Sequence, residues 1–229
     1  MLINASIFSF FGQINALFQK FAASPGTEIW IFVVLGLIIF IETGIVIFPF
    51  LPGDSVLFFV GSLSAISMKH GGNLYLWLLI LVMGAIAFLA NLLNFEIGRF
   101  FGDAIPKHPL LSRFLKPEYM ADAHKFFERW GAWAIFLGRF MPIIRTIVPF
   151  TAGAGKMPHR KFILFNLLGG YAWVTVALGA GFLFGNIPFV QKNLELIMLA
   201  IVVVSVLPAV IGGIRSYQKR KQTPESPKK

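Results

Sequence analysis

The sequence predicts an all-α, polytopic integral membrane protein built from two inverted halves. Hydrophobic residues make up 57% of the 229-residue chain and charged residues 13%, compared with about 25% charged residues in soluble domains. Long uncharged runs within 74–95, 162–185 and 194–214 reach the roughly 20 residues that cross a bilayer. Two further apolar stretches, 41–55 and 138–153, contain charges and prolines that a simple span would lack.

Charge and cysteine content narrow the functional classes. The chain has no cysteine, which excludes disulfides, thiol catalysis and cysteine-bound metals. Its net charge of +10 comes from basic residues in short loops and at the C-terminus, a pattern typical of membrane topology and anionic lipid headgroups rather than of nucleic-acid binding. The spans also lack a constellation of hydroxyl, histidine and carboxylate groups. We therefore expect no enzyme activity, catalytic residue, metal site or cofactor.

Four charges fall inside the two proline-containing stretches. Glu42 and Asp54 belong to the first, and Arg139 and Arg145 to the second. A charged side chain at the centre of a membrane helix costs roughly 2.5–3.5 kcal/mol on insertion scales. These side chains must therefore face one another, water or a polar ligand, and they mark a polar site at membrane depth.

The distribution of Lys and Arg predicts the topology. Three segments are rich in these residues and should be cytoplasmic: 99–129, 156–161 and the C-terminal tail. The connectors near 70 and at 186–193 hold one Lys each and should be external. Segment 131–155 then begins and ends on the same side of the membrane, which predicts a re-entrant hairpin.

Prolines and glycines supply the expected breaks of the two hairpins, because an interior proline removes a helical hydrogen bond and clashes with the preceding turn. The first hairpin, at about 30–67, would break at Pro49, Pro52 and Gly53. The second would break at the residues Pro142, Pro149 and Gly153. Interrupted hydrophobic segments at corresponding positions of two halves indicate a transporter site at the interface of inverted repeats.

The remaining segments flank this core. Residues 28–215 form one predicted membrane transport domain, which includes a cytoplasmic amphipathic segment at 103–130. Residues 1–27 form either a further span or an interfacial helix, and 216–229 a disordered, basic cytoplasmic tail. Tryptophans near the predicted span ends are interpreted as interface anchors, namely Trp130, Trp133 and Trp173.

Arginine chemistry suggests a role for the second hairpin. A guanidinium keeps its charge and makes bidentate hydrogen bonds to phosphate, and a chain break at Pro142 could bring Arg139 and Arg145 to one pocket. In the alternative, each arginine only pairs with Glu42 or Asp54 as a structural lock. The two carboxylates could carry protons, serve as fixed counter-ions or, for Asp54, cap a helix N-terminus.

The motifs that carry these residues resemble those of the DedA family, whose wider superfamily includes SNARE-associated or VTT proteins. They are Phe-Ile-Glu-Thr-Gly at 40–44, Pro-Phe-Leu-Pro-Gly-Asp-Ser at 49–55, Ile-Gly-Arg-x-x-Gly at 97–102 and Gly-Arg-Phe-x-Pro-x-x-Arg-Thr-x-x-Pro-x-x-Ala-Gly at 138–153. The likeness extends over about residues 28–215.

This resemblance implies a bacterial inner-membrane protein with two re-entrant loops and a role in envelope homeostasis. It also implies undecaprenyl phosphate recycling or phospholipid translocation that depends on the proton-motive force. By motif position, the family's functional acidic pair falls on Glu42 and Asp54, and its essential arginines on Arg139 and Arg145. Many members carry an aspartate where this chain has Asn91, which cannot titrate.

The first hypothesis is a proton-linked lipid-phosphate translocase, with Arg139 and Arg145 on the phosphate and Glu42 and Asp54 relaying protons. Its partners would be a polyprenyl phosphate or a phospholipid. The alternatives are a proton-coupled antiporter for a small cation and a non-transporting scaffold that organises the membrane. A homo-oligomer is compatible with each of them.

Overall fold

A computed structural model describes the helical core of the chain. The described residues are 13, 28–44, 53–69, 71–101, 127–141, 144–185, 187–193, 196–197 and 200. The regular elements in these ranges are all helical, as the sequence predicts. They are α2 (Glu28–Gly44), α3 (Gly53–Lys69), α4 (Leu76–Phe101), α7 (Trp133–Gly138), α8 (Ile144–Ala154), α9 (His159–Phe184) and α10 (Pro188–Lys192).

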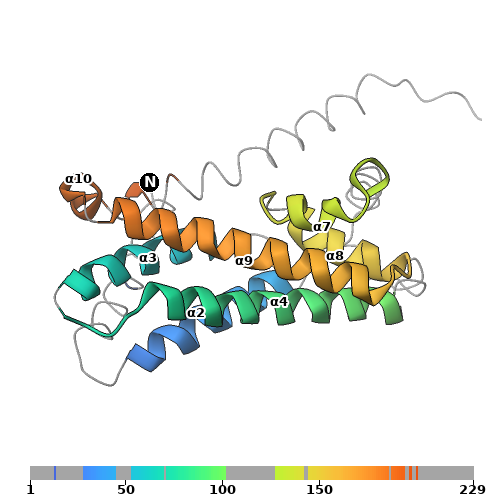
Figure 1. Cartoon of the computed structure of the whole chain (residues 1–229), viewed down its shortest axis with the longest axis horizontal. Coiled ribbons are helices and arrows are strands. Elements are labelled where there is room, and N and C mark those ends of the chain that lie inside the picture. Colours follow the sequence, from blue (N-terminus) through green and yellow to red (C-terminus); the bar gives the residue numbers. More distant parts are fainter. Residues whose placement is uncertain are drawn as a thin grey trace, which may run out of the picture.

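Two long helices, α4 and α9, form the centre of the fold and pack against each other (Figure 1). Each has 26 residues and is apolar and long enough to cross a membrane, with a length of about 39 Å at 1.5 Å per residue. They cover the predicted spans at 74–95 and 162–185. Helix α4 continues to Phe101, past the charged residues Glu96 and Arg99.

The outer faces of these helices leave large apolar side chains uncovered. Exposed residues on α4 and α9 are Trp77, Leu81, Leu89, Leu93, Leu164, Leu168, Val176 and Leu183. Monomeric soluble proteins rarely expose apolar patches of this extent. The described helices therefore have the surface of a protein that is solvated by lipid.

Two of the shorter helices pack within their own half of the sequence, and two pack across the halves. Helix α2 packs on α4 and α7 packs on α9, each within its own half of the sequence. Helix α3, in contrast, packs on α9, and α8 packs on α4. Figure 1 shows α3 near one end of the α4–α9 pair and α7 and α8 near the other. The second helix of each charged stretch thus lies against the long helix of the opposite half.

Glycines allow the backbones to approach closely where α8 packs on α4 and where α3 packs on α9. A Cβ at Gly153 of α8 would collide with the carbonyl oxygen of Phe95, and one at Gly98 of α4 with that of Phe150. At the other crossing, Gly61 and Gly181 place the backbones of α3 and α9 in the same kind of contact. Small residues at such positions let membrane helices approach closely.

The helix boundaries correct part of the predicted hairpin breaks. Helix α8 continues through Pro149, so the prediction that this residue breaks the second hairpin is wrong, and Gly153 lies one residue before the end of the helix at Ala154. Pro149 lies in the second turn, where a proline removes one backbone hydrogen bond and a short helix can continue. Gly153 serves the contact with α4 instead. The chain leaves helical structure between Gly138 and Ile144.

In the first stretch, α2 ends at Gly44 and Gly53 begins α3. Pro49, Pro52 and Pro142 lie outside the described residues, as do nearly all of the segments 1–27, 103–130 and 194–214 and the whole tail 216–229.

Candidate functional site

Three of the four predicted charges meet where α2, α3 and α8 converge. Arg145 in the first turn of α8 donates from Nη1 to Asp54 Oδ1 at 3.0 Å and forms an ion pair with Glu42 at the end of α2. The Arg145 and Glu42 side chains are 4% and 0% exposed, whereas Asp54 is 24% exposed. Arg145 is therefore a buried guanidinium shared by two carboxylates.

Asp54 lies within the first turn of α3, one residue after the helix begins. Its Oδ1 atom also accepts a hydrogen bond of 2.8 Å from the indole Nε1 of Trp173. Asp54 therefore bonds to two other helices, α8 and α9. Glu42 in turn lies against Gly53, where a Cβ would overlap its carboxylate.

Trp173 is part of the site and not an interface anchor, which corrects the interpretation from the sequence. It is 5% exposed and lies in the middle of α9. Its ring centroid is 5.3 Å from Arg145 Cζ, a distance at which a cation is attracted to an aromatic face. Trp130 and Trp133 are both exposed.

Arg139, directly after α7, lies apart from this cluster of charges. It is only 2% exposed, and its Nη2 atom donates to the carbonyl of Ala87 at 3.0 Å and to Asn166 Oδ1 at 2.7 Å. With its amide oxygen turned toward the guanidinium, Asn91 accepts from Nη2 at 2.9 Å and from Nε at 3.2 Å. Within the described ranges no carboxylate pairs with Arg139, and its Nη1 atom has no hydrogen-bond partner.

Among the described residues, pairing with a carboxylate therefore describes Arg145 but not Arg139. The charge on Arg139 is solvated by neutral oxygens from α4 and α9. A buried charge held in this way, without a carboxylate partner among the described residues, is expensive.

Two glycines of α9 make room for this guanidinium. A Cβ at Gly170 would lie 3.3 Å from Arg139 Nη2, and one at Gly169 would lie 3.4 Å from Arg139 Cγ and 3.0 Å from Phe136 Cα. Side chains at these positions would press on Arg139 and on the end of α7. The Gly-Gly pair in a predicted span was the sequence signal that could have indicated this space for the Arg139 side chain.

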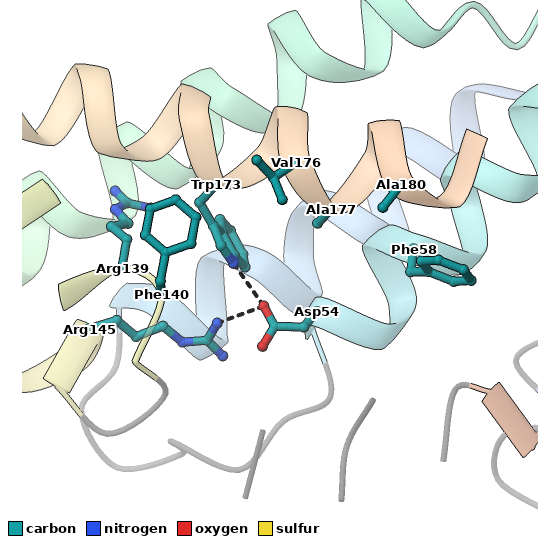
Figure 2. A pocket seen from close by; sticks show the side chains of 9 residues that line it. All are labelled: Asp54, Phe58, Arg139, Phe140, Arg145, Trp173, Val176, Ala177 and Ala180. Atoms are coloured by element: carbon teal, nitrogen blue, oxygen red, sulfur yellow. Dashed lines mark hydrogen bonds and ion pairs between the residues drawn. The ribbon is translucent and has the colours of Figure 1, made fainter. Parts of the chain in front are cut away.

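Both arginines border one cavity of about 230 Å³. This volume exceeds the roughly 30 Å³ that one water molecule occupies several times over. Figure 2 shows Arg139, Arg145, Asp54 and Trp173 together at one end of the cavity. The wall continues along α3 and α9 with apolar side chains, those of Phe58, Val176, Ala177 and Ala180. The surface of the cavity is almost entirely apolar, and the charged residues Asp54, Arg139 and Arg145 border one end, which we call its polar end.

Sequence reasoning found the charges of the site and missed its neutral members. Asn166 links the halves, since its Nδ2 donates to the carbonyl of Phe88 at 3.0 Å while its Oδ1 accepts from Arg139. Asn91 occupies the position at which the family resemblance predicts an aspartate, and that position lies beside Arg139. Asn94 also crosses to α8, donating to the carbonyl of Thr146 at 2.7 Å.

An all-helical fold with lipid-type surfaces and a buried charged site defines a polytopic membrane protein, and comparison with known proteins gives its family. Residues 51–183 match the model of the VTT domain. The chain is 41% identical over 187 residues to Protein DedA of Escherichia coli K12, covering 82% of this chain and 84% of the relative. This chain belongs to the DedA family.

Further relatives carry names that state a membrane location. An uncharacterized membrane protein of Mycobacterium tuberculosis is 42% identical over 190 residues, covering 83% of this chain and 82% of the relative. The inner membrane protein YghB of Escherichia coli K12 is 33% identical over 205 residues, covering 87% and 91% of the two chains. No solved structure matches the chain.

Proposed function

We propose that this protein is a transporter that moves a lipid phosphate across the bacterial inner membrane, with undecaprenyl phosphate or a phospholipid as substrate. The observation that carries the proposal is the largely apolar cavity bordered at its polar end by Arg139, a buried cation with no carboxylate partner among the described residues. The inner-membrane location follows the name of the relative YghB. The basic tail supports a cytoplasmic C-terminus.

The two ends of the cavity match the two parts of such a substrate. Guanidinium groups recognise phosphate through planar, charge-assisted hydrogen bonds, and two of them border the polar end. The apolar wall formed by Phe58, Val176 and Ala180 can receive the first part of a hydrocarbon tail. Because Val176 is exposed on the outer face of α9, the rest of the tail could remain in lipid.

The packing of the helices supports the proposed inverted repeat. Helix α3 of the first half contacts the long helix of the second, and α8 of the second contacts the long helix of the first. In both long helices the contact glycine, Gly98 or Gly181, lies one turn before the helix end. Such reciprocal contacts suit two re-entrant hairpins that move against each other in alternating access.

Proton coupling is proposed for Glu42 and Asp54. Both carboxylates share Arg145 as their cation. If a substrate phosphate takes over Arg145, a buried carboxyl group loses its counter-charge and its neutral, protonated form is favoured. Phosphate binding and proton uptake would then occur together, which would link transport to the proton-motive force.

The cation antiporter is less well supported by the same geometry. A small cation would have to replace Arg145 between the two carboxylates, in a cavity wall that also carries Arg139. Two guanidiniums and one carboxylate border the cavity, and this charge balance favours an anionic ligand.

The test is transport of undecaprenyl phosphate in liposomes that contain the purified full-length protein, with an imposed proton gradient. We expect gradient-dependent movement that falls at least about tenfold in Arg139→Lys, because a point charge cannot replace the planar fork, and that loses its gradient dependence in Glu42→Gln. Arg160→Lys, an exposed substitution on α9, is the matched control. Movement no faster than in protein-free liposomes would reject the transporter in favour of the scaffold.

A further inference from the structure

We propose that the Asp54 carboxylate lies at the position that a phosphate oxygen of the bound substrate would take, and that Trp173 is a phosphate-binding residue. This inference rests on the proposed function and deepens it. It assigns Asp54 the role of an internal competitor that the substrate displaces, and gives the indole N–H a role in recognition.

The hydrogen bonds of Asp54 have the pattern of a bound anion. One oxygen, Oδ1, accepts from Arg145 Nη1 at 3.0 Å and from Trp173 Nε1 at 2.8 Å. The two donors come from different helices, α8 and α9, and converge at the polar end of the cavity (Figure 2). Charge-assisted donors that converge on one oxygen are the usual means of holding a phosphate.

Asp54 is also the charged residue of the cluster that is best placed to leave. Its side chain is 24% exposed, whereas Glu42 and Arg145 are almost completely buried. When Asp54 turns away, Arg145 keeps its ion pair with Glu42 through Nη2 and releases Nη1. The guanidinium therefore stays in position while one of its donors becomes available.

The charges favour replacement of one anion by another. Counted together, the ionised side chains of Arg139 and of the cluster are neutral while Asp54 is in place, and they carry one positive charge without it. A phosphate group restores the lost negative charge. It would receive the two donors released by Asp54, namely Arg145 Nη1 and Trp173 Nε1.

Trp173 adds selectivity for an acceptor. An indole N–H only donates, and a buried donor that loses its partner is costly. Because the Trp173 side chain is fixed in α9 and lies against Arg145, its Nε1 keeps its direction after Asp54 leaves. A phosphate oxygen at the position of Oδ1 satisfies it.

The experiment is calorimetric titration of the purified full-length protein with farnesyl phosphate, a short prenyl monophosphate. We expect Asp54→Asn to bind about tenfold more tightly than the unmodified protein, because a neutral amide competes less for the donors. In the Asp54→Asn background, Trp173→Phe should weaken binding about tenfold, since it removes a donor to a charged group. Trp133→Phe, at an exposed tryptophan, is the matched control.

The outcomes separate this inference from the proposed function. If the unmodified protein binds and Arg139→Lys does not, yet Asp54→Asn binds no more tightly, the competitor role is overturned and the proposed function stands. If Trp173→Phe has no effect in the Asp54→Asn background, Trp173 only orients Asp54. If no variant binds farnesyl phosphate, the proposed function fails and this inference fails with it.

The calorimetric experiment includes a second variant of Asp54 and a second ligand. Asp54→Ser should bind as tightly as Asp54→Asn, and it serves as the second variant if the amide does not fold. Inorganic phosphate should bind at least about tenfold more weakly than farnesyl phosphate, because the apolar end of the cavity stays empty. Equal binding of the two would reject the lipid as the source of the phosphate.

Discussion

Arg139 and Arg145 are both almost completely buried, yet their surroundings are opposite. Arg145 contacts two carboxylates and an aromatic face. Arg139 contacts a backbone carbonyl and asparagine side chains, and one of its N–H groups is unpartnered within the described residues. The difference shows that one sequence motif supplies two arginines in two environments: one is held by counter-ions, and the other is held by neutral oxygens among the described residues.

The largest expected effect removes the charge of Arg145. Arg145→Met leaves Glu42 and Asp54 without their cation, and breaking a buried ion pair destabilises a protein by about 3–5 kcal/mol. Arg139→Met removes a charge that has no carboxylate partner in the described structure, so its destabilisation should be much smaller. Thermal unfolding of both variants in detergent checks this order. Equal losses of thermal stability would contradict the distinction between the two arginines.

The next effect concerns the crossing that brings Asp54 to Trp173. A Cβ at Gly181 would meet the carbonyl of Phe58, so Gly181→Ala must move α3 away from α9. We expect a destabilisation of about 1–3 kcal/mol, as for other overpacked sites. Gly179→Ala is the matched control, since nothing lies within 4 Å of its added Cβ. Thermal unfolding of the pair provides the comparison, and equal stability would argue against the close crossing.

A substitution at Asn91 should make Arg139 resemble Arg145. Asn91→Asp places a carboxylate beside the guanidinium and offsets part of the cost of burying its charge, so we expect thermal stability to rise by about 1 kcal/mol. Binding of farnesyl phosphate should become several-fold weaker at neutral pH and recover at lower pH, because the introduced carboxyl competes only when ionised. Titrations at several pH values measure this change. Binding that does not change with pH would show that residue 91 does not affect the guanidinium that donates to the ligand.

The smallest expected effect lies at the apolar end of the cavity. Ala180→Phe fills space beside Phe58 and should weaken farnesyl phosphate binding by several-fold, while inorganic phosphate binding stays unchanged. Titration with both compounds separates the two effects. Equal weakening of both would indicate that the substitution disturbs the polar end.

The charged part of the site was predictable because charges are costly in lipid. Glu42, Asp54, Arg139 and Arg145 stand out in apolar stretches, and their types suggested a phosphate site. Neutral polar residues give no comparable signal. Asn91 was marked only by the family resemblance, and the site contacts of Asn166 and Trp173 became visible only when the fold joined segments as distant as the 119 positions that separate Asp54 and Trp173.

The helical fold was predictable from hydrophobic length, and the positions of the breaks less so. Pro149 has the composition of a hinge, but it falls early in a helix that neighbouring helices support. Gly153 reads as a break in sequence and acts as a contact in the structure. A proline or glycine in the sequence does not by itself determine where a helix ends. Here we infer that packing of α8 against α4 supports the helix through both positions.

The most direct test of phosphate binding by Arg139 compares initial rates of undecaprenyl phosphate translocation for Arg139→Lys and Arg160→Lys in liposomes under the same proton gradient. Both variants keep the charge, and only the first removes the planar fork from the cavity. We predict that the initial rate falls at least about tenfold in Arg139→Lys and does not change in Arg160→Lys. Equal rates in the two variants would contradict the claim that Arg139 holds the phosphate.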